Sequence, residues 1–411
     1  MSARRLLGRI VKWKDPMAMS DNSQHGVWNT LRRELGRMAS DRVYLLLMLV
    51  LPLATFVFFI TMFQGGKPEN LPVAVYDADH SSLSRQVTRM IDATSSIRIT
   101  REVDDLAQGK ALLQEKKVYG LVVFPTGMEK DVYRGTAPNV VAYYNNAFLI
   151  PGSLLQRDIK TVVGTVSAGI ALSTSEKKGS TPNQAMAQIQ PIRLDTHVLF
   201  NPYTSYFYYL VSCFLPVMLQ IFIMTVTVYA LGTELKDGTA SDWLDSAGGN
   251  VIKGLFGKML PYSLVFLLIA FLMVIGQFSY FGMPLRGSLG LILFGTLLFV
   301  VTYQAVSIFF VSVFPSLRMC LSIASSYGAM AFTFSGLTFP YSAMPLGAKL
   351  FGMLFPFSHF LKLFIDQAFR GAPLAVDLLT IAGLSAFLVL PWLALHKLKR
   401  VSYAPEYWHR I

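Results

Sequence analysis

The chain has 411 residues, of which 53% are hydrophobic and only 15% are charged, and its formal net charge is +12. A soluble domain carries about 25% charged residues, so this composition excludes a single globular domain with a fully solvated surface. The basic residues flank long apolar runs and form no compact basic face, which argues against nucleic acid as a partner.

Residues 1–42 are rich in Lys and Arg and precede the first long apolar run. Within them, residues 25–41 predict an amphipathic helix that lies in the membrane interface, with apolar side chains on one face and arginines away from it. The candidate residues of this interfacial helix are Trp28, Leu31, Arg33, Glu34 and Leu35. The alternative is a lipid-facing segment with no further role.

Six uncharged windows have the ~20 apolar residues that a helix needs to cross a bilayer. They are residues 43–63, 205–231, 259–281, 289–314, 319–339 and 374–395, the last with Asp377 near its outer end. The first window predicts a retained signal anchor rather than a cleaved signal peptide, because it is too long and no Ala-x-Ala site follows. The positive-inside rule then places both termini, including the tail 396–411, in the cytoplasm.

Residues 64–204 contain nearly half of the charged residues and predict an inserted extracytoplasmic α/β domain. The predicted strands are residues 71–76, 96–100, 118–124 and 139–144, and the predicted helices are 81–92, 104–117 and 149–176. Ser81 or Ser82 is the expected N-cap of the first of these helices. A polar loop is expected at 176–183.

Asp77 and Asp79 stand at the end of the first predicted strand, where carboxylates can bind a metal ion or act in catalysis. His80, Ser81 and Ser82 follow them directly and belong to the same expected turn. A solvated turn between strand and helix is therefore the favoured interpretation of this pair.

Two further segments belong to neither the spans nor the domain. Residues 232–258 predict a cytoplasmic loop that is too long for a simple turn. Residues 346–361 are short for a span and carry Lys349 and Pro356, which is typical of a re-entrant or interfacial segment within the region 340–373.

The chain offers no evident energy source for transport. The predicted span cores carry hydroxyl and amide groups but no ionisable residue, which disfavours ion coupling, although sodium sites built from backbone and hydroxyl oxygens stay open. The nearest approach to a phosphate-binding loop, Gly254 to Lys258, lacks the required hydroxyl residue. Cysteines and histidines are too few or too scattered for a metal site. We expect no enzymatic activity, cofactor or metal on this chain.

Several short motifs occur in a characteristic order along this topology. They are Arg33-Glu34 and Asp41-Arg42, Pro52, Val73 to Asp79, Asn201-Pro202, Glu234 to Leu244 with Gly238-Thr239, Gly257-Lys258, Ser335-Gly336, Phe339-Pro340, Met344-Pro345 and Phe355-Pro356. In this order the chain resembles ABC transporter permeases of the type 2 exporter class, in the bacterial branch with a large external domain. The resemblance covers most of the chain from about residue 27.

The resemblance implies a helix that couples the permease to a separate ABC ATPase, which would hold the ATP and Mg²⁺. The implied coupling residues are Glu234, Lys236, Gly238, Thr239, Trp243 and Leu244, and the implied external re-entrant gate is formed by Gly336, Pro340, Pro345 and Pro356. It also implies a second permease subunit, identical or paralogous, in a bacterial inner membrane. Whether the external domain docks a periplasmic adaptor stays open.

With apolar, aromatic and hydroxyl side chains in the spans, the expected substrate is amphipathic or lipophilic, either a drug-like molecule or a lipid. One alternative function is a membrane receptor or scaffold that transports nothing and binds a ligand through its external domain. A secondary transporter is the other. A neighbouring gene for an ATPase would favour export, and one for a sensor kinase would favour the receptor.

Overall fold

The computed structural model describes residues 26–179, 181–189, 199–201 and 205–408, and it is mostly helical. Contacts between Cα atoms divide the chain into two compact units. One unit, called here the α/β unit, spans residues 62–210. The other, called the helical unit, consists of the described parts of residues 1–61 and 211–411.

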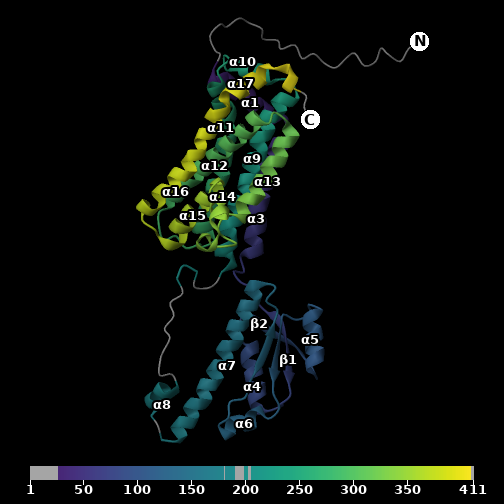
Figure 1. The fold of residues 1–411 in the computed structure, drawn as a ribbon, viewed down its shortest axis with the longest axis vertical. Coiled ribbons are helices and arrows are strands. Elements are labelled where there is room, and N and C mark those ends of the chain that lie inside the picture. Colours follow the sequence, from purple (N-terminus) through teal and green to yellow (C-terminus); the bar gives the residue numbers. More distant parts are fainter. Residues whose placement is uncertain (1–25, 180, 190–198, 202–204, 409–411) are drawn as a thin grey trace, which may run out of the picture. The chain divides into compact units, whose positions relative to one another are not determined.

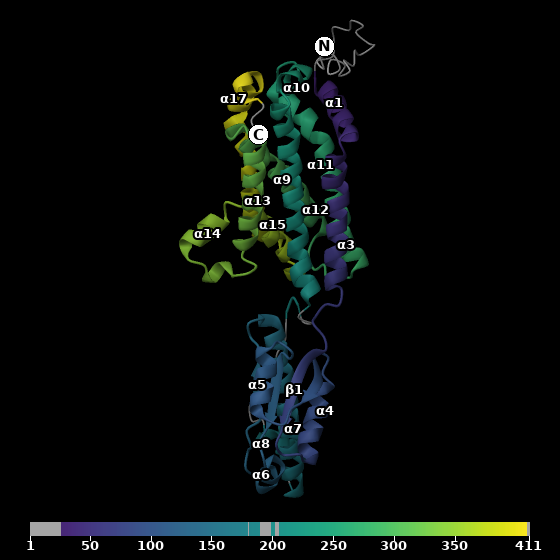
Figure 2. The ribbon, with the colours of Figure 1, turned by 90° about the vertical axis from the view of Figure 1, so that its right-hand side faces the viewer.

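The helical unit contains the long apolar helices (Figures 1 and 2). In chain order its elements are α1 (Val27–Ser40), α2 (Arg42–Leu45), η1 (Leu46–Val50), α3 (Leu51–Phe63), η2 (Phe207–Val211), α9 (Ser212–Lys236), α10 (Ala240–Ser246), α11 (Val251–Ile275), η3 (Gly276–Tyr280), α12 (Leu289–Val313), α13 (Leu317–Thr333), η4 (Tyr341–Ala343), α14 (Leu346–Gly352), α15 (Pro356–Ile365), η5 (Asp366–Arg370), α16 (Leu374–Ala386), η6 (Phe387–Val389), α17 (Leu390–Tyr403) and η7 (Pro405–Tyr407). Helices α3 and η2 continue into the α/β unit.

Five continuous helices are long and apolar enough to cross a membrane. They are Arg42–Phe63, Phe207–Lys236, Val251–Tyr280, Leu289–Val313 and Leu374–Tyr403. The bent pair Leu346–Gly352 and Pro356–Arg370 would make a sixth if it were one span. The chain is thus a multi-pass membrane protein, and five of the six predicted windows are confirmed as candidate spans.

The predicted window 319–339 is the exception. Its helix, α13, ends at Thr333 and has 17 residues, so it rises about 25 Å and falls short of a ~30 Å hydrocarbon core. Phe334 caps the helix, and the chain then turns through Gly336, which adopts a left-handed conformation with φ 85°. Apolar composition alone could not reveal this break.

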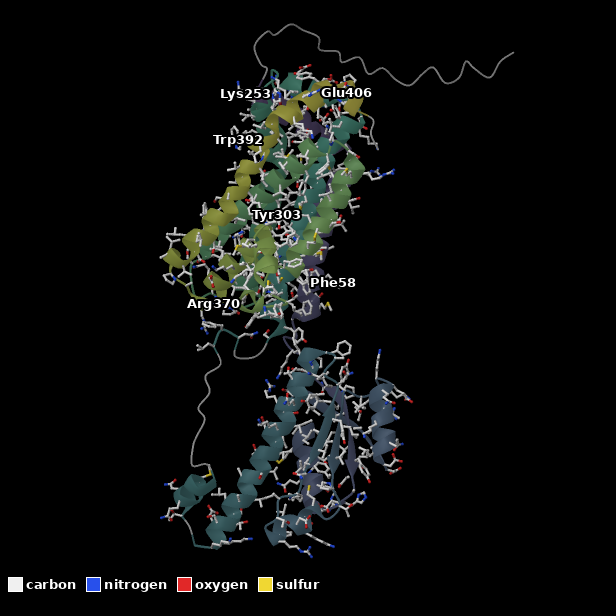
Figure 3. The ribbon with its side chains drawn as sticks, in the orientation of Figure 1. Phe58, Lys253, Tyr303, Arg370, Trp392 and Glu406 are labelled. Atoms are coloured by element: carbon white, nitrogen blue, oxygen red, sulfur yellow. The ribbon has the colours of Figure 1, made fainter. Side chains whose placement is uncertain are left out.

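Helix α12 lies at the centre of the helical unit and packs against α9, α11, α13, α15, α16 and α17. Its Phe299 and Tyr303 are fully buried, 1% and 0% exposed. On the outside, Phe58 and Trp392 are 58% and 62% exposed (Figure 3). Large apolar side chains on the outer surface are expected where lipid, not water, surrounds the helices.

The α/β unit is built on a four-stranded sheet with helices on both faces (Figure 1). Its elements are β1 (Leu71–Asp77), α4 (Ser82–Asp92), β2 (Ile97–Glu102), α5 (Leu106–Gln114), β3 (Gly120–Phe124), α6 (Met128–Arg134), β4 (Val141–Tyr144), α7 (Leu149–Lys177) and α8 (Pro182–Ile189). The strand order is β2-β1-β3-β4, with β1 parallel to β2 and β3, and β4 antiparallel to β3. The predicted strand and helix order is confirmed, apart from α6 and α8, which the sequence interpretation missed.

The two carboxylates at the end of β1 bind the turn into α4 and the first turn of α6. The Oδ2 atom of Asp77 accepts a hydrogen bond from the Ser84 hydroxyl at 2.6 Å, and Asp79 accepts one from the backbone N–H of Glu129 at 3.1 Å. Ser81 is the N-cap and forms a capping box with Ser84. Within the described ranges, no group of three or more His, Cys, Asp or Glu residues could hold a metal ion.

The chain enters and leaves the α/β unit at the same place. The backbone N–H of Tyr206 donates to the carbonyl of Gly66, and Gly66 has φ 76°. This contact, called here the neck, closes the whole unit into a loop whose two ends touch.

Candidate functional site

The end of the helical unit where α1, α10 and the C-terminal half of α17 gather holds a buried cluster of charges (Figures 1 and 2). The prediction of a long loop at 232–258 is wrong here. Helix α9 continues to Lys236, α10 follows, and α11 begins at Val251, so only short turns separate three helices. Glu234 and Lys258 consequently lie near the ends of the two candidate spans Phe207–Lys236 and Val251–Tyr280, outside the windows 205–231 and 259–281 whose cores were predicted to carry no ionisable residue.

Glu234 of α9 is the central acceptor of the cluster and is 1% exposed. Arg33 of α1 donates to both of its oxygens, Nη1 to Oε1 at 2.6 Å and Nη2 to Oε2 at 2.9 Å. Arg37 Nη1 also donates to Oε1, and its Nη2 donates to Thr233 Oγ1 at 2.9 Å. A planar guanidinium pairs with a carboxylate bidentately, so this contact fixes α1 on α9 in direction as well as distance.

Lys258 of α11 joins a second carboxylate to the first. Its Nζ lies 2.6 Å from Glu34 Oε2 and 2.8 Å from Glu234 Oε1, and both it and Glu34 are 0% exposed. The hydroxyl of Tyr262, one turn along α11, donates to the other oxygen of Glu34. Lys258 also stands over the ring of Trp243, 5.7 Å from its centroid.

These side chains of Arg33, Glu34, Arg37, Glu234 and Lys258 are called here the charge network. Each buried charge has a partner of opposite sign, as low-dielectric burial requires. Burial alone would lower the pKa of Arg37, but the nearby carboxylates of Glu234 and Glu34 raise it above its ordinary value, so that guanidinium stays charged. Removing one partner of such a pair typically costs about 3–5 kcal/mol, so α1, α9 and α11 behave as one body.

Helix α10 is attached to the network through the turn before it. Gly238 has φ 71°, and the N–H of Thr239 bonds to the carbonyl of Glu234 at 2.9 Å, which is the pattern of a Schellman C-cap. The Thr239 hydroxyl also donates to Glu234 Oε2. Trp243 and Leu244, both residues of α10, are buried. Trp243 Nε1 donates to the carbonyl of Gly254 at 3.3 Å.

Helix α1 packs closely on α11 at a glycine. A Cβ atom on Gly257 would lie 2.6 Å from the carbonyl oxygen of Val27 and 2.9 Å from Thr30 Cβ. The opposite face of α1 exposes Trp28 and Leu35, at 69% and 50%. This exposed apolar face is the one that the sequence predicted for the membrane interface. Two further candidate residues differ in burial: Lys236 is exposed, and Leu31 is half-buried.

The candidate gate residues lie at the other end of the helical unit. Pro345 precedes α14, Pro356 is the first residue of α15, and Pro340 precedes η4. The ring of Tyr341 covers Gly336, where an added Cβ would collide with Tyr341 Cδ2. The structure therefore brings the four candidates into one segment, away from the charge network.

We expect Gly336→Ala to loosen this segment, because alanine is disfavoured at positive φ and its Cβ would displace the Tyr341 ring. The variant should be cleaved by protease in detergent faster than the parent chain between α13 and α14. Gly347→Ala is the matched control, since nothing lies within 4 Å of its Cβ position. Equal cleavage rates in both would contradict the expectation.

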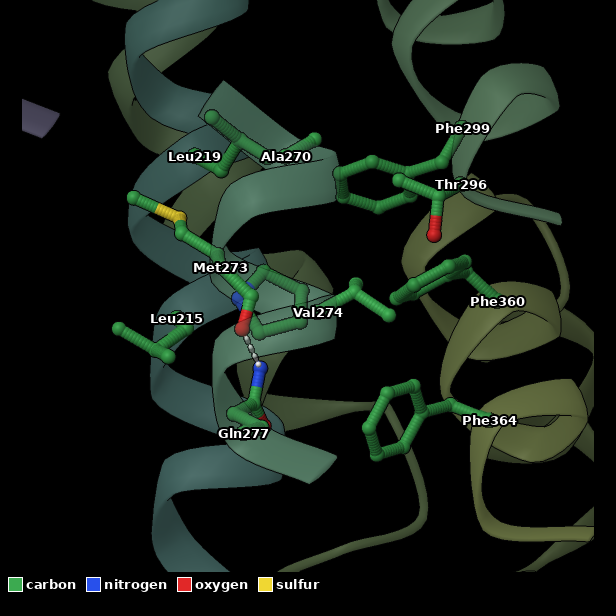
Figure 4. Close-up of a pocket in the computed structure, with 11 residues that line it drawn as sticks. Leu215, Leu219, Ala270, Met273, Val274, Gln277, Thr296, Phe299, Phe360 and Phe364 are labelled. Atoms are coloured by element: carbon green, nitrogen blue, oxygen red, sulfur yellow. Dashed lines mark hydrogen bonds between the residues drawn. The ribbon is translucent and has the colours of Figure 1, made fainter. Parts of the chain in front are cut away.

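A small apolar cavity lies between α9, α11, α12 and α15 (Figure 4). Its volume of about 20 Å³ suits roughly one water molecule. Phe299, Phe360 and Phe364 line one side, and Gln277, whose Nε2 donates to the carbonyl of Met273 at 3.1 Å, lines the other. The Gln277 Oε1 atom has no hydrogen-bond partner among the described residues.

Sequence reasoning named Arg33, Glu34, Glu234 and Thr239 but did not foresee that they meet. It left Lys258, Arg37 and Tyr262 out of the candidate site. The sequence did contain a signal for them. Ionisable residues lie at the ends of the apolar windows, where charges can be held near a membrane boundary.

A model of the family described as "ABC-2 family transporter protein" (ABC2_membrane_3) matches residues 42–395. A comparison with curated proteins finds no similar sequence.

Proposed function

Because the chain belongs to the ABC-2 family of transporter proteins, we propose that it is the membrane-spanning permease subunit of an ATP-driven ABC exporter. A separate ABC ATPase chain binds Mg²⁺ and ATP and hydrolyses the nucleotide. This chain itself carries no catalytic group, and its task is to convert movement of the ATPase into movement of the spans.

The charge network is the observation that carries this proposal. It ties α10, at the end of the helical unit, to α1 and to the ends of two spans, α9 and α11. A push on α10 by the ATPase would therefore move both spans together. ATP shifts the complex between two states only if it binds the ATPase differently in each, and a rigid connection of this kind would pass that shift on to the spans.

The proposal extends to placement and partners. Both termini and α10 lie in the cytoplasm of a bacterium, the spans cross the inner membrane, and the α/β unit lies outside. The basic residues around α1 and in the last turns of α17 support this orientation. A second permease subunit completes the pathway, and a periplasmic adaptor would bind the α/β unit.

The proposed substrate is amphipathic or lipophilic, such as a drug-like molecule or a lipid. The support is the residue content of the candidate spans, which offer apolar, aromatic and hydroxyl side chains but few charges. The cavity between α9, α11, α12 and α15 has the same kind of lining, although its volume of about 20 Å³ is far too small for such a ligand. Aromatic and apolar walls with few polar groups are typical of sites for such ligands.

The test is co-expression with the ATPase encoded beside this gene, followed by reconstitution of the complex in vesicles. ATP-dependent movement of a lipophilic dye or fluorescent lipid, abolished when the ATPase is inactivated, is the expected result. Movement driven by an ion gradient without ATP would instead support a secondary transporter.

Trp243→Ala should uncouple the permease from its ATPase, because the indole fills the space beneath α10 and lies against Lys258. Coupling free energies of about 1–3 kcal/mol correspond to about 5- to 150-fold, so we expect substrate stimulation of ATP hydrolysis to fall at least about fivefold. Asp242→Asn, on the exposed side of α10, is the control for a change of surface charge. Unaltered stimulation in Trp243→Ala would remove α10 from the mechanism.

A further inference from the structure

The last candidate span, Leu374–Tyr403, contributes no side chain to the charge network but has its own contact with α10. At its end, the hydroxyl of Tyr403 donates to Asp245 Oδ1 of α10 at 2.7 Å. The same hydroxyl lies near the turn after α10, where an added Cβ on Gly249 would be 3.6 Å from it. The hydrogen bond between Tyr403 and Asp245 is called here the α17 contact.

The C-terminal half of this span, α17, is firmly seated on its neighbours. It packs against α12 and α10, and its Ala394, Leu398 and Val401 are buried. Lys397 Nζ donates to the carbonyl of Val313, the last residue of α12, at 2.7 Å. A cation is favourable at this place, because the final carbonyls of a helix have no partner within it and carry partial negative charge. Helix α17 therefore joins the end of the central helix α12 to α10 (Figure 1).

A change of helix type separates α17 from α16, the N-terminal half of the span. Phe387–Val389 form one 3-10 turn, and Pro391 follows at the second position of α17. Proline lacks the N–H that would bond to the carbonyl four residues earlier, and a 3-10 stretch within a helix often marks a hinge. Just before this turn, the carbonyl of Leu384 accepts a hydrogen bond from the hydroxyl of Thr302 on α12 at 3.3 Å. The span is thus continuous but weakened at one level, where α17 can tilt relative to α16.

Helix α16 is held on the other side of this break by α15 and η5. Gln367 Nε2 donates to Asp377 Oδ2 at 2.6 Å, and Gln367 Oε1 accepts the backbone N–H of Ser288 at 2.8 Å. Gly383 packs so closely on α15 that an added Cβ would lie 2.7 Å from the ring of His359. The two halves of the span therefore belong to opposite ends of the helical unit (Figure 1).

We propose that the last span is a second route by which α10 moves the spans, with Tyr403 and Asp245 as the positioning residues that connect it. When α10 moves, the α17 contact draws α17 along, and the span bends at Phe387–Val389 while α16 stays with α15. The charge network moves α9 and α11 in the same step. The inference rests on the proposed function, because the ATPase must supply the movement of α10.

The test measures ATP hydrolysis, with and without a lipophilic dye as substrate, in the complex of the full chain with its ATPase. Tyr403→Phe removes one hydroxyl and should lower the ratio of stimulated to basal hydrolysis about threefold, the effect of one lost hydrogen bond. Asp245→Leu should do the same, whereas Asp245→Asn keeps an oxygen acceptor for the tyrosine and should preserve the ratio. Tyr280→Phe, 83% exposed at the end of another span, is the matched control for loss of a hydroxyl.

The double variant Tyr403→Phe, Asp245→Leu should lower the ratio no further than either single variant, because both changes remove the same hydrogen bond. An unchanged ratio in Tyr403→Phe, or effects that multiply in the double variant, would overturn the inference and leave the proposed function intact. A parent complex that hydrolyses ATP but moves no dye and shows no stimulation would overturn both.

The break in the span has its own variant. Pro391→Ala restores the N–H that can bond to the carbonyl of Phe387, so it should stiffen the span at this level. We expect a denaturation midpoint no lower than that of the parent, together with less dye moved per ATP hydrolysed. A purely structural role for the proline would not give a stable complex that transports poorly. Dye movement equal to that of the parent would show that the span does not bend there.

Discussion

Glu234→Gln is expected to lower the free energy of unfolding by about 3–5 kcal/mol, the usual cost of removing one partner from a buried ion pair. The amide would leave Arg33, Arg37 and Lys258 with Glu34 as their remaining carboxylate in the network. Thermal denaturation of the purified chain in detergent measures the loss as a lower midpoint. Asp242→Asn removes an exposed carboxylate of α10 and should leave the stability within about 0.5 kcal/mol of the parent.

The same variant should lose substrate-stimulated ATP hydrolysis in the assembled complex, even at temperatures where it stays folded. A double-mutant cycle separates the contribution of the charge pair to the free energy of unfolding from a general loss of structure. The double variant Lys258→Met, Glu34→Gln should lose less free energy of unfolding than the two single variants lose in sum. The reason is that the double variant leaves no unpaired charge at these two positions. Strict additivity would show that the charge network is not an energetic unit.

Gly257→Val is the second change with a large expected effect. Its side chain has no room against the carbonyl of Val27 and the side chain of Thr30, so α1 must move away from α11 and weaken the contact of Glu34 with Lys258. Overpacking of this kind costs about 1–3 kcal/mol. We expect a lower denaturation midpoint. We also expect substrate stimulation of ATP hydrolysis in the assembled complex to fall at least about fivefold.

Gly36→Ala is the control for the glycine change, since Gly36 lies on α1, the helix that Gly257 contacts, with nothing within 4 Å of its Cβ position. Alanine is favoured over glycine in a helix by about 0.5–1 kcal/mol. A rise in stability at Gly36, with unchanged coupling, would assign the effect of Gly257→Val to the packing of α1 on α11. Equal effects at both positions would contradict that assignment.

The spans and the order of elements in the α/β unit could be predicted because both depend on local sequence. A stretch of ~20 apolar residues reports a span wherever its helix is continuous, and Ser81 before α4 is a residue type that typically caps a helix. The prediction fails at α13, which ends at Thr333 inside an apolar window, three residues before the left-handed Gly336. Composition contains no information about such a backbone conformation.

The charge network could not be predicted, because its members are distant in the sequence. Arg33 and Glu234 are 201 positions apart, and Glu34 and Lys258 are 224 apart. A search for uncharged windows also stops at the first ionisable residue, so Glu234 and Lys258 marked the edges of a predicted loop. In the structure they lie within α9 and α11, since a charge with buried partners need not end a helix.

The neck between Gly66 and Tyr206 has a consequence for how such a protein can change. The two ends of the inserted unit touch. The unit therefore joins the spans on either side as a short hairpin would, whatever its size. A replacement module whose termini are equally close can be spliced at this point without altering the distance between α3 and η2. The α/β unit can thus diversify, by recombination or by engineering, while the helical unit keeps its geometry.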